Sequence, residues 1–429
     1  MTSTSRTELA PDPALPHRDV LLDETAMRGM LATALGIDGP ADVGEPTIAD
    51  VTYHVGKSVR AVFRASIDGA EQTIAACMFT GAESGDVYRR SAPDAKDVAA
   101  IRGIAHDAAI GAVYWVLPND RRITSLGAVL DPATPVPSRI TSAPVHKRLV
   151  AYTPEKSATL VCEDGTQTPI AYAKVAASHE AARDYTTYAS LRTALDPVHP
   201  WLCLPQSLAY SGAQRTLWLE ALPGRRMAES GSDDEIADLE RLGAAAAAFH
   251  GLAVPNAPRF DRFSTDRIAD DAATLRSTRP DAAEAVDRLA ARLTATGVAA
   301  DGHACLHGDL HPHNAIVCSD RVALIDIEEV GVGATAADIA SLLAGLLYRR
   351  ETGQLSRDDC RSRAQAFLVG YRTHRDLPRR ESLAWHTAAA LFTERAARAI
   401  TRMRLLGLEH LPTLLATSER LLDRGLEVL

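Results

Sequence analysis

The chain has 429 residues, with 46 Lys or Arg, 55 Asp or Glu and a formal net charge of -9 at pH 7. At roughly 100–200 residues per domain, the length predicts two or three domains, and the acidic balance without a long basic run excludes nucleic acid as an expected partner. The six cysteines form no Cys-x-x-Cys pair, which excludes a zinc knuckle or a disulfide framework and predicts reduced thiols in a cytoplasmic protein.

The N-terminal stretch, residues 1–22, is rich in Ser, Thr and Pro and lacks the apolar core of a signal peptide, so we expect a disordered tail. An apolar run, IASLLAGLLY at residues 339–348, is the best candidate for a membrane helix but is shorter than the roughly 18 residues that such a helix needs. We therefore expect a soluble protein with no membrane partner.

Three parts follow the tail. Residues 23–143 mix short strands with helical stretches and end in the proline-rich segment PATPVPSR, which is typical of a linker. Residues 144–226 are β-rich, and residues 227–429 are mostly helical and rich in Ala and Leu. Strands that come first and helices that come last predict an α+β fold.

The two β-rich parts contain a weak internal repeat. YHVGKSVRAVFRASIDGAEQTIAACMF at residues 53–79 resembles YTPEKSATLVCEDGTQTPIAYAKV at residues 152–175. Each copy alternates apolar and polar residues around an Asp-Gly pair, which predicts a β-hairpin with a short turn. In this alignment Lys174 of the second copy falls on Met78 of the first, so only the second copy could hold an anion there. Two unrelated hairpins with similar turn residues remain the alternative.

The segment HGDLHPHN, residues 307–314, has two functional interpretations. As a zinc site, it would use the alternating residues His307, Asp309, His311 and His313, which would project to one face of a strand. An intervening glycine and proline make a regular strand improbable, and no second cluster completes a hydrolytic site. A metal hydrolase is therefore the lesser alternative. Another is that these histidines are hydrogen-bonded in a loop that has no function.

The second interpretation is phosphoryl transfer. Two apolar runs flank the Ser319-Asp320 corner and predict a hairpin. Pairing outward from that corner brings Asn314 opposite Ile325, with Asp326 one residue further. An amide and a carboxylate oxygen close together suit Mg²⁺ that carries nucleotide phosphates. Asp309, just before the hairpin, is then left to meet the acceptor hydroxyl, which is the division of roles in kinase-type transfer.

HGDLHPHN followed by LIDIEEVGVG at residues 324–333 resembles the paired signature of the aminoglycoside phosphotransferase and choline kinase superfamily. The resemblance implies an α+β chain with the bilobal fold of protein kinases. Residues 144–226 would form a β-rich N-lobe and hinge, and residues 227–429 a mostly helical C-lobe with the catalytic loop. Residues 23–143 would form an additional N-terminal α/β cap domain, as in the maltokinase-like branch, to which the chain is most similar.

The same resemblance implies roles for single residues. Asp309 corresponds to the catalytic acid of the loop, Asn314 to the metal-binding amide and Asp326 to the metal-binding acid. His307 corresponds to the loop histidine that shapes the backbone and does not react. ATP and Mg²⁺ are the implied cofactors.

Upstream, kinase-like catalysis needs a cation over the phosphates, held by a helix acid. Lys174 ends a predicted strand and would supply the cation, and Ser178 can cap the next helix. Glu180 is the first expected partner of Lys174, and Asp184, one turn later, is the second. The alternative for Lys174 is a solvated lysine at a strand end.

The family pattern and this chain differ at the phosphate loop. No glycine-rich loop precedes Lys174, and the corresponding turn carries Lys156 and Ser157 instead. The segment TLWLEALPGRRM, residues 216–227, would be the hinge between the lobes. There the backbone of Glu220, Ala221 and Leu222 would bond the adenine.

The resemblance also implies that the acceptor pocket lies among the downstream helices. Thr335 and Asp338 form a plausible capping box, so Asp338 is expected to be structural. Glu328 and Glu329 could meet an amine or hydroxyl groups of the acceptor, with solvated acids as the alternative. A helix through residues 385–395 could line the same cleft, or simply pack.

The sequence therefore predicts an ATP-dependent phosphotransferase. It would move the γ-phosphoryl group to a hydroxyl of a small polar acceptor such as a sugar, an aminoglycoside or a related natural product. One alternative is a kinase that acts on Ser or Thr of a precursor peptide in natural-product biosynthesis. Another is a non-catalytic pseudokinase scaffold, against which the intact Lys174, Asp309, Asn314 and Asp326 argue. The acceptor, the choice between ATP and GTP and the oligomeric state stay open.

Overall fold

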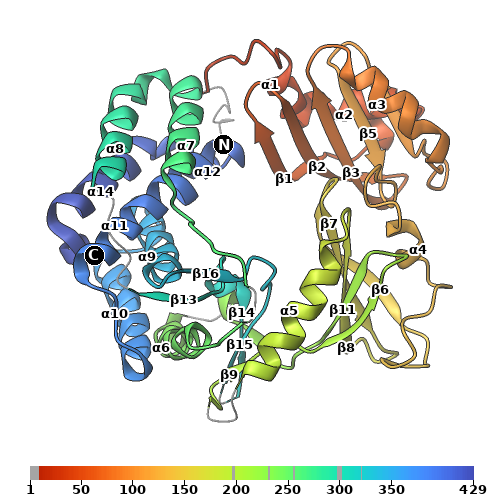
Figure 1. Ribbon diagram of the computed structural model, residues 1–429. Helices are drawn as coiled ribbons and strands as arrows, with labels where there is room; N and C mark the ends of the chain where they lie inside the picture. Colours follow the sequence, from red (N-terminus) through yellow and green to blue (C-terminus); the bar gives the residue numbers. More distant parts are fainter. Residues whose placement is uncertain (1–8, 196–198, 230–231, 255–256, 297–301, 320) are drawn as a thin grey trace. The chain divides into compact units, whose positions relative to one another are not determined.

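Strands dominate the first half of the chain and helices the second, so the predicted α+β class is confirmed (Figure 1). The computed structural model describes residues 9–195, 199–229, 232–254, 257–296, 302–319 and 321–429. The chain divides into two compact units. The first comprises Met1–Ala182, Leu208–Leu219 and Thr401–Met403, and the second Arg183–Ser207, Glu220–Ile400 and Arg404–Leu429.

Two five-stranded antiparallel sheets repeat one topology. The first has the order β1-β2-β3-β5-β4 and the second, read from its first strand, β6-β7-β8-β11-β10. A helix follows the third strand of each sheet, α3 (Glu83–Ser91) and α5 (Glu180–Ala194). The strands are β1 (Thr47–His54), β2 (Ser58–Ile67), β3 (Ala70–Phe79), β4 (Ile104–Asp107), β5 (Ala112–Val116), β6 (His146–Thr153), β7 (Ser157–Glu163), β8 (Pro169–Ala176), β10 (Ser207–Ser211) and β11 (Thr216–Glu220).

The two copies also share hydrogen bonds that two unrelated hairpins would not have in common. The Tyr53 hydroxyl donates to Asp12 Oδ2 at 2.7 Å, and the Tyr152 hydroxyl donates to Asp120 Oδ2 at 2.8 Å. In each copy the backbone N–H three residues after the tyrosine donates to that same carboxylate oxygen, at 2.8 Å. The first strand of each copy also has one register irregularity, between Ile48 and Asp50 near the start of β1 and between Leu149 and Ala151 in the middle of β6.

The strand registers correct the sequence alignment of the repeat by one residue. Lys174 pairs with Thr159, the third residue of β7, whereas Cys77 pairs with Arg60, the third residue of β2. Lys174 therefore corresponds to Cys77 and not to Met78. Because successive residues of a strand project to opposite faces, this one-residue change moves the comparison to the other face of the sheet.

The turn of the second hairpin explains that error. Asp68 and Gly69 both have positive φ, 50° and 79°, and close the first hairpin as the predicted two-residue turn. The second predicted hairpin is also present, but residues 164–168 close it, so its turn extends beyond the Asp-Gly pair. The Asp164 carboxylate accepts hydrogen bonds from the backbone N–H groups of Thr166 and Thr168, which stabilises this longer loop.

The predicted disordered tail over residues 1–22 is wrong for its described part, which begins at Leu9. Leu9 and Leu15 are buried, and a short helix, α1 (Arg18–Leu21), follows. The Arg18 guanidinium is 1% exposed and donates to the Tyr53 hydroxyl at 3.3 Å. Composition misled here because a few anchoring side chains order a segment that is otherwise rich in Ser, Thr and Pro.

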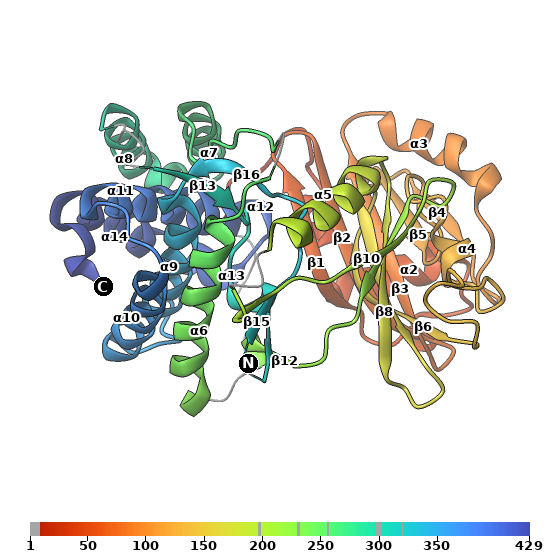
Figure 2. The same cartoon turned by 60° about the horizontal axis from the view of Figure 1, so that its bottom comes forward.

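The second unit is a helical bundle around one buried helix. Helix α9 (Ala336–Glu351) buries eleven of its sixteen residues, and α10, α11 and α14 pack against it (Figure 2). The other elements of the bundle are α6 (Ser232–His250), α7 (Thr265–Thr278), α8 (Ala283–Ala295), α10 (Arg357–His374), α11 (Arg380–Ala390), the π-helical segment η7 (Leu391–Ala397), α12 (Arg398–Thr401), α13 (Leu405–Glu409) and α14 (Leu411–Arg424). None of the helices in the described residues is long and apolar enough to cross a membrane.

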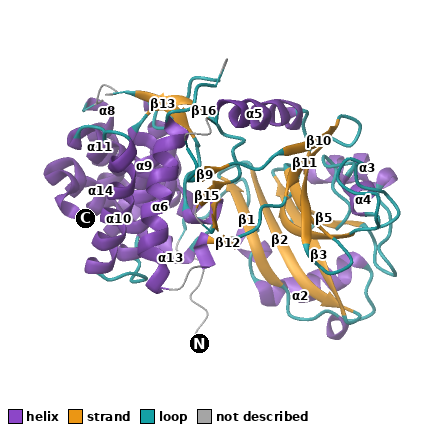
Figure 3. Ribbon diagram, turned by 90° about the horizontal axis from the view of Figure 1, so that it is seen from below, coloured by secondary structure: helices purple, strands orange, loops and turns teal. Residues whose placement is uncertain are grey.

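Two small ladders lie beside these helices and carry the loops of interest (Figure 3). One has the order β12-β14-β15-β9 and the other pairs β13 with β16. Their strands are β9 (Leu202–Cys203), β12 (Arg225–Arg226), β13 (His303–Leu306), β14 (Ala315–Cys318), β15 (Arg321–Leu324) and β16 (Gly331–Ala334). Short strands suffice here because they serve to fix loops and not to form a core.

A buried acid in the turn between β6 and β7 joins the two copies of the sheet. The Glu155 side chain is 4% exposed and pairs with Arg60 of β2, at 2.7 Å, and with Arg121. Burial opposes ionisation, but the hydrogen bonds and charges of the two arginines hold the pKa of Glu155 below its ordinary value. The turn between β6 and β7 is thus tied to the first sheet.

Replacing Glu155 with Gln should lower the free energy of unfolding by on the order of 3 kcal/mol, because two arginines lose a buried partner. Chemical denaturation at pH 7 measures this loss, with Glu71→Gln, an exposed acid of β3, as the control. The folded-state pKa of Glu155 is depressed, so its contribution is complete above the ordinary pKa of 4.5 and is lost as the pH falls through the lower folded-state pKa. A difference between variant and wild type that stays constant from pH 7 to strongly acidic pH would refute this ion pair.

Candidate active site

The hairpin β14–β15 has the register that the sequence predicts. Val317 pairs with Val322, and beyond the last pair the Ile325 N–H donates to the Asn314 carbonyl at 3.0 Å. Asp320, half of the predicted corner, lies outside the described residues, and Ser319 before it has φ of 35°. The hairpin therefore places Asn314 directly across from the residue that precedes Asp326.

The Asn314 side chain is oriented by its own loop. Its Nδ2 donates to the Asp309 carbonyl at 3.0 Å and to Asp309 Oδ2 at 3.3 Å. Among the described residues no donor reaches the Asn314 side-chain oxygen, which leaves that oxygen as a potential metal ligand. Asp326 is exposed and has φ of 64°, a left-handed conformation that turns the chain sharply at the end of the hairpin.

His307 supports the loop and is not placed to react. It is 1% exposed, its Nε2–H donates to the Ile325 carbonyl at 3.0 Å, and its Nδ1 accepts from the Asp309 N–H at 3.3 Å. Burial lowers the pKa of His307, which agrees with a neutral ring that donates through one nitrogen and accepts through the other.

Asp338 in the first turn of α9 fixes the backbone of the loop. Its carboxylate accepts from the N–H groups of His307, at 2.6 Å, and Gly308, at 3.1 Å, and contacts His250 Nε2 at 3.2 Å. Burial opposes ionisation, yet the hydrogen bond and charge of His250 and the charge of Arg262 hold the pKa of Asp338 below its ordinary value.

The predicted capping box at Thr335 is wrong. The Thr335 side chain makes no cap hydrogen bond, and Asp338 turns to the loop and not to the Thr335 backbone. The sequence thus has the spacing of a capping box, but the Asp338 carboxylate accepts its hydrogen bonds from the loop at His307 and Gly308. Gly308 is required there as well, because it has φ of 85° and a Cβ on it would lie 2.4 Å from the Glu329 carbonyl oxygen.

Asp309 lies among three cationic or potentially cationic side chains. Its Oδ2 is 3.3 Å from His311 Nε2, and its Oδ1 is 3.9 Å from Arg262 Nη2. Burial alone would raise its pKa, but the hydrogen bond and charge of His311 and the charges of Arg262 and Arg398 hold the pKa of Asp309 well below its usual range. At neutral pH the carboxylate is therefore ionised.

Arg262 was missed in the sequence and is central to the site. Its side chain is 7% exposed and pairs through Nε with Glu394, whose side chain is 3% exposed. Glu394 belongs to η7, a π-helical segment between α11 and α12, and such segments are often found at functional sites. No local pattern singles out Arg262 or Glu394, because the pair joins segments that are 132 positions apart.

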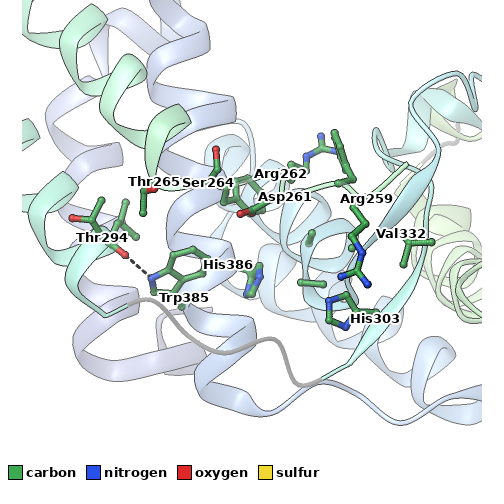
Figure 4. Close-up of a pocket in the computed structure, with 16 residues that line it drawn as sticks. Arg259, Asp261, Arg262, Ser264, Thr265, Thr294, His303, Val332, Trp385 and His386 are labelled. Atoms are coloured by element: carbon green, nitrogen blue, oxygen red, sulfur yellow. Dashed lines mark hydrogen bonds between the residues drawn. The ribbon is translucent and has the colours of Figure 1, made fainter. Parts of the chain in front are cut away.

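A cavity of about 460 Å³ is lined in part by α11, where Trp385 and His386 face Arg259 and His303 (Figure 4). Trp385 donates its indole N–H to the Leu293 carbonyl at 3.1 Å. A second cavity, of about 630 Å³, opens at Asp309 and includes Arg395. The helix through residues 385–395 therefore contributes to two cavities, and only its last part reaches Asp309.

Glu328 and Glu329 line neither of these cavities. They contribute to a third one, of about 560 Å³, together with Arg183 and other residues of the same unit. The Tyr188 hydroxyl lies 3.5 Å from Glu328 Oε1. This placement gives no support to the expected contact of Glu328 and Glu329 with an acceptor at Asp309.

The histidines of the motif do not converge as zinc ligands. Among the residues that the structure describes, no group of three or more His, Cys, Asp or Glu side chains is placed to hold a metal ion. His307 is committed to Ile325, whereas His311 and His313 lie with their rings 5.7 Å apart and nearly perpendicular. The zinc-hydrolase alternative therefore has no structural support in the described part.

The upstream residues predicted to bind the nucleotide lie in β8, α5 and β11. Lys174 is half-buried in β8. Glu180, the first residue of α5, accepts a hydrogen bond from the Ser178 hydroxyl at 3.0 Å. The Glu220 N–H donates to the Gln206 carbonyl, and the Glu220 carboxylate accepts from the Gln206 N–H, so this side chain fixes the bend after β11. The nucleotide contacts of Lys174, Glu180, Glu220, Ala221 and Leu222 stay predictions.

Comparison with known proteins identifies the family. Residues 171–383 match the model of the phosphotransferase enzyme family, so this part of the chain belongs to that family. The predicted superfamily, with its kinase-like α+β fold, and the predicted class of enzyme, a phosphotransferase, are thereby confirmed. The narrower assignment to a maltokinase-like branch stays a prediction. No curated protein sequence matches the chain.

The chain is also similar to several solved structures. A choline/ethanolamine kinase family protein from Mesorhizobium loti is 13% identical over 66% of this chain and 89% of that chain, with a TM-score of 0.44. An aminoglycoside-3'-phosphotransferase of type VIII is 21% identical over 57% and 93%, with a TM-score of 0.43. A spectinomycin phosphotransferase in complex with ADP and spectinomycin is 10% identical over 67% and 95%, with a TM-score of 0.46.

Replacing Asp338 with Asn should misplace the loop without touching Asp309 itself. One N–H donor would face the amide nitrogen in place of an oxygen, and leaving a buried donor unsatisfied costs roughly 1–3 kcal/mol. We expect lower stability and a lower kcat, measured by denaturation and by ADP release. Asp266→Asn, an exposed acid in the first turn of α7, is the matched control. Wild-type turnover in Asp338→Asn would show that the loop does not depend on this carboxylate.

Proposed function

We propose that the protein transfers the γ-phosphoryl group of ATP to a hydroxyl of a small polar acceptor. The observation that carries this proposal is the position of Asp309, whose side chain is 31% exposed and lines a cavity of about 630 Å³. The low pKa of this carboxyl agrees with an ionised group. A cavity of this size suits a small molecule. The membership of residues 171–383 in a phosphotransferase family supports the same reaction.

In this mechanism the acceptor hydroxyl enters the cavity and donates a hydrogen bond to Asp309. As the bond between the hydroxyl oxygen and the γ-phosphorus forms, the bond from that phosphorus to the bridging oxygen of ADP breaks, ADP leaves, and the proton of the hydroxyl passes to the Asp309 carboxylate. Asn314 holds that carboxylate in place through its side-chain N–H, and Arg262 and His311 balance its charge. Asp309 thus orients the nucleophile and accepts its proton, which is the role of the acid in kinase-type transfer.

The metal and nucleotide would be held by the residues that the sequence singles out. The side-chain oxygen of Asn314 and the carboxylate of Asp326 are hard oxygen donors of the type that Mg²⁺ prefers. Mg²⁺ bound there would neutralise charge on the phosphates of ATP. Lys174, supported by Glu180 or Asp184, would contact the phosphates.

We place the adenine of ATP at the bend after β11. The backbone of Glu220, Ala221 and Leu222 would bond the base, with Glu220 already fixed against Gln206.

Two other functions make different predictions for the same protein. A kinase acting on Ser or Thr of a precursor peptide would release ADP only with peptide acceptors. A pseudokinase scaffold would release none. Mg-ATP should raise the melting temperature of the protein, and ADP release should follow addition of a small-molecule acceptor pool. Absence of both responses would overturn the proposed function.

Asp309→Ala should keep the stabilisation by Mg-ATP and lose turnover by on the order of 10²–10⁴, the usual contribution of a general base. Thermal shift with Mg-ATP and the rate of ADP release measure the two effects separately. Asp376→Ala, an exposed acid outside the cavity, is the control. Equal turnover of Asp309→Ala and wild type would remove Asp309 from the mechanism.

His311→Asn should move the acid side of the pH–rate profile. The hydrogen bond and charge of His311 lower the pKa of Asp309, so their loss should let that pKa rise toward its ordinary value of 3.8. Only the carboxylate form can accept the proton, and the variant should therefore lose kcat/KM at a higher pH than wild type as the pH falls. His410→Asn, outside the cavity, serves for comparison. An acid limb at the same pH in all three proteins would contradict this coupling.

A further inference from the structure

The cavity at Asp309 has a strongly basic lining. Four arginines of the helical unit contribute to it, against two carboxylates, those of Asp309 and Glu235. The arginines are Arg349 at the end of α9, Arg395 in η7, Arg398 in α12, and Arg404, which follows that helix. His311 and His313 add two imidazoles to the same wall.

The carboxylate on the cavity wall away from Asp309 is already neutralised. Glu235 accepts hydrogen bonds from Arg349, at 2.9 Å, and from Arg363, at 2.8 Å. In the part of the chain that the structure describes, no carboxylate lies within 4.0 Å of the guanidinium of Arg395, Arg398 or Arg404. Three cations therefore face the cavity without an ion-pair partner.

Arg395 is held in this position by its surroundings. Its Nη2 donates to the Ser341 carbonyl at 3.0 Å, and Gly345 makes room for it, since a Cβ there would lie 3.0 Å from the same nitrogen. Its Nε is buried and has no hydrogen-bond partner within the described residues. Burial lowers the pKa of Arg395. The charges of Glu394 and Asp309 oppose this effect, whereas those of Arg398 and Arg404 add to it, so the three cations disfavour one another.

A purely structural explanation of this cluster is weak. Arginines that stabilise the fold here are paired, as Arg262 is with Glu394 and Arg363 with Glu235. Like charges held close together without ion-pair partners of their own repel one another in the absence of a ligand, although the charges of Glu394 and Asp309 oppose this repulsion at Arg395. A bound anion would relieve that repulsion, and arginine is well suited to bind the oxygens of a phosphate or carboxylate in a fork.

We propose that the acceptor is itself an anion: a hydroxylated small molecule that carries a phosphate or carboxylate group. This inference rests on the proposed function, because it assigns the cavity at Asp309 to the acceptor. The hydroxyl meets Asp309, and the anionic group is bound by Arg395, Arg398 and Arg404 of the same cavity lining. Polycationic acceptors such as aminoglycosides and quaternary amines are disfavoured, since they would add positive charge to a basic wall.

The first experiment compares acceptors that differ in charge. Wild-type protein with Mg-ATP is assayed for ADP release with hexoses, the matching hexose phosphates, the matching sugar acids and the matching amino sugars. We expect kcat/KM to be at least about tenfold higher for an anionic member than for its neutral parent. Phosphates and sugar acids are separate arms, so the assay also identifies which anion is preferred. Faster turnover of a neutral or cationic member than of every anionic member would overturn the inference and leave the proposed function intact.

The second experiment tests the arginines directly. The double variant Arg398→Gln/Arg404→Gln should raise the KM for the anionic acceptor at least about tenfold while the KM for Mg-ATP stays within about twofold. Arg361→Gln, an exposed arginine of α10, is the control. A rise in the KM for Mg-ATP alone would show that the cluster binds the nucleotide, which overturns the inference.

A binding measurement separates the inference from catalysis. In Asp309→Ala, whose turnover should be strongly reduced, the anionic acceptor should still raise the melting temperature in the presence of Mg-ADP. Adding Arg398→Gln/Arg404→Gln should abolish that shift. This result would support the inference even if the acceptor were not phosphorylated. No shift by any phosphate or sugar acid, with normal stabilisation by Mg-ADP, would overturn it.

Discussion

The geometry of the site depends on one buried carboxylate. Asp338 is fully buried and accepts from the backbone of His307 and Gly308 while it contacts His250. From His307 the bonds continue to the Asp309 N–H, and from Asp309 to the Asn314 side chain. A buried charge is tolerated only when it is fully hydrogen-bonded, so the loop and α9 require each other. The core of the bundle thereby sets the position of the reacting acid.

The arginines around Asp309 come from segments other than α9, which fixes the loop. Arg262 approaches it from the loop before α7, held by Glu394 of the π-helical segment, and the same segment carries Arg395 into the cavity. An extra residue in a helical turn changes the direction of every side chain after it. Within the π-helical turns, Glu394 therefore points to the buried pair with Arg262 while Arg395 points to the cavity wall. An uninterrupted α-helix would direct these two side chains differently.

What could be predicted from the sequence was local. The hairpin β14–β15 follows from apolar runs around a polar corner, and its register then brings Asn314 to Asp326. Contacts between distant segments left no such signal. Asp338 fits a capping box in sequence although it bonds a loop 30 residues away, and the Arg262 pair has no local pattern at all. The family resemblance supplied the enzyme class, but it could not supply the charge of the cavity.

The two copies of the sheet differ at the position where the sequence predicts a cation for the nucleotide phosphates. At the position of Lys174 the first copy has Cys77, which is fully buried, and burial raises the pKa of its thiol, so that copy has no cation to offer a phosphate. Directly opposite Cys77 stands Arg60, whose guanidinium is paired with Glu155 in the turn before β7. The first sheet has no lysine at this position, but its Arg60 still helps to order the turn between β6 and β7 of the second sheet. A turn without glycines can be held in place in this way, because Glu155 adopts φ of 62° and the ion pairs with Arg60 and Arg121 offset the strain of that conformation.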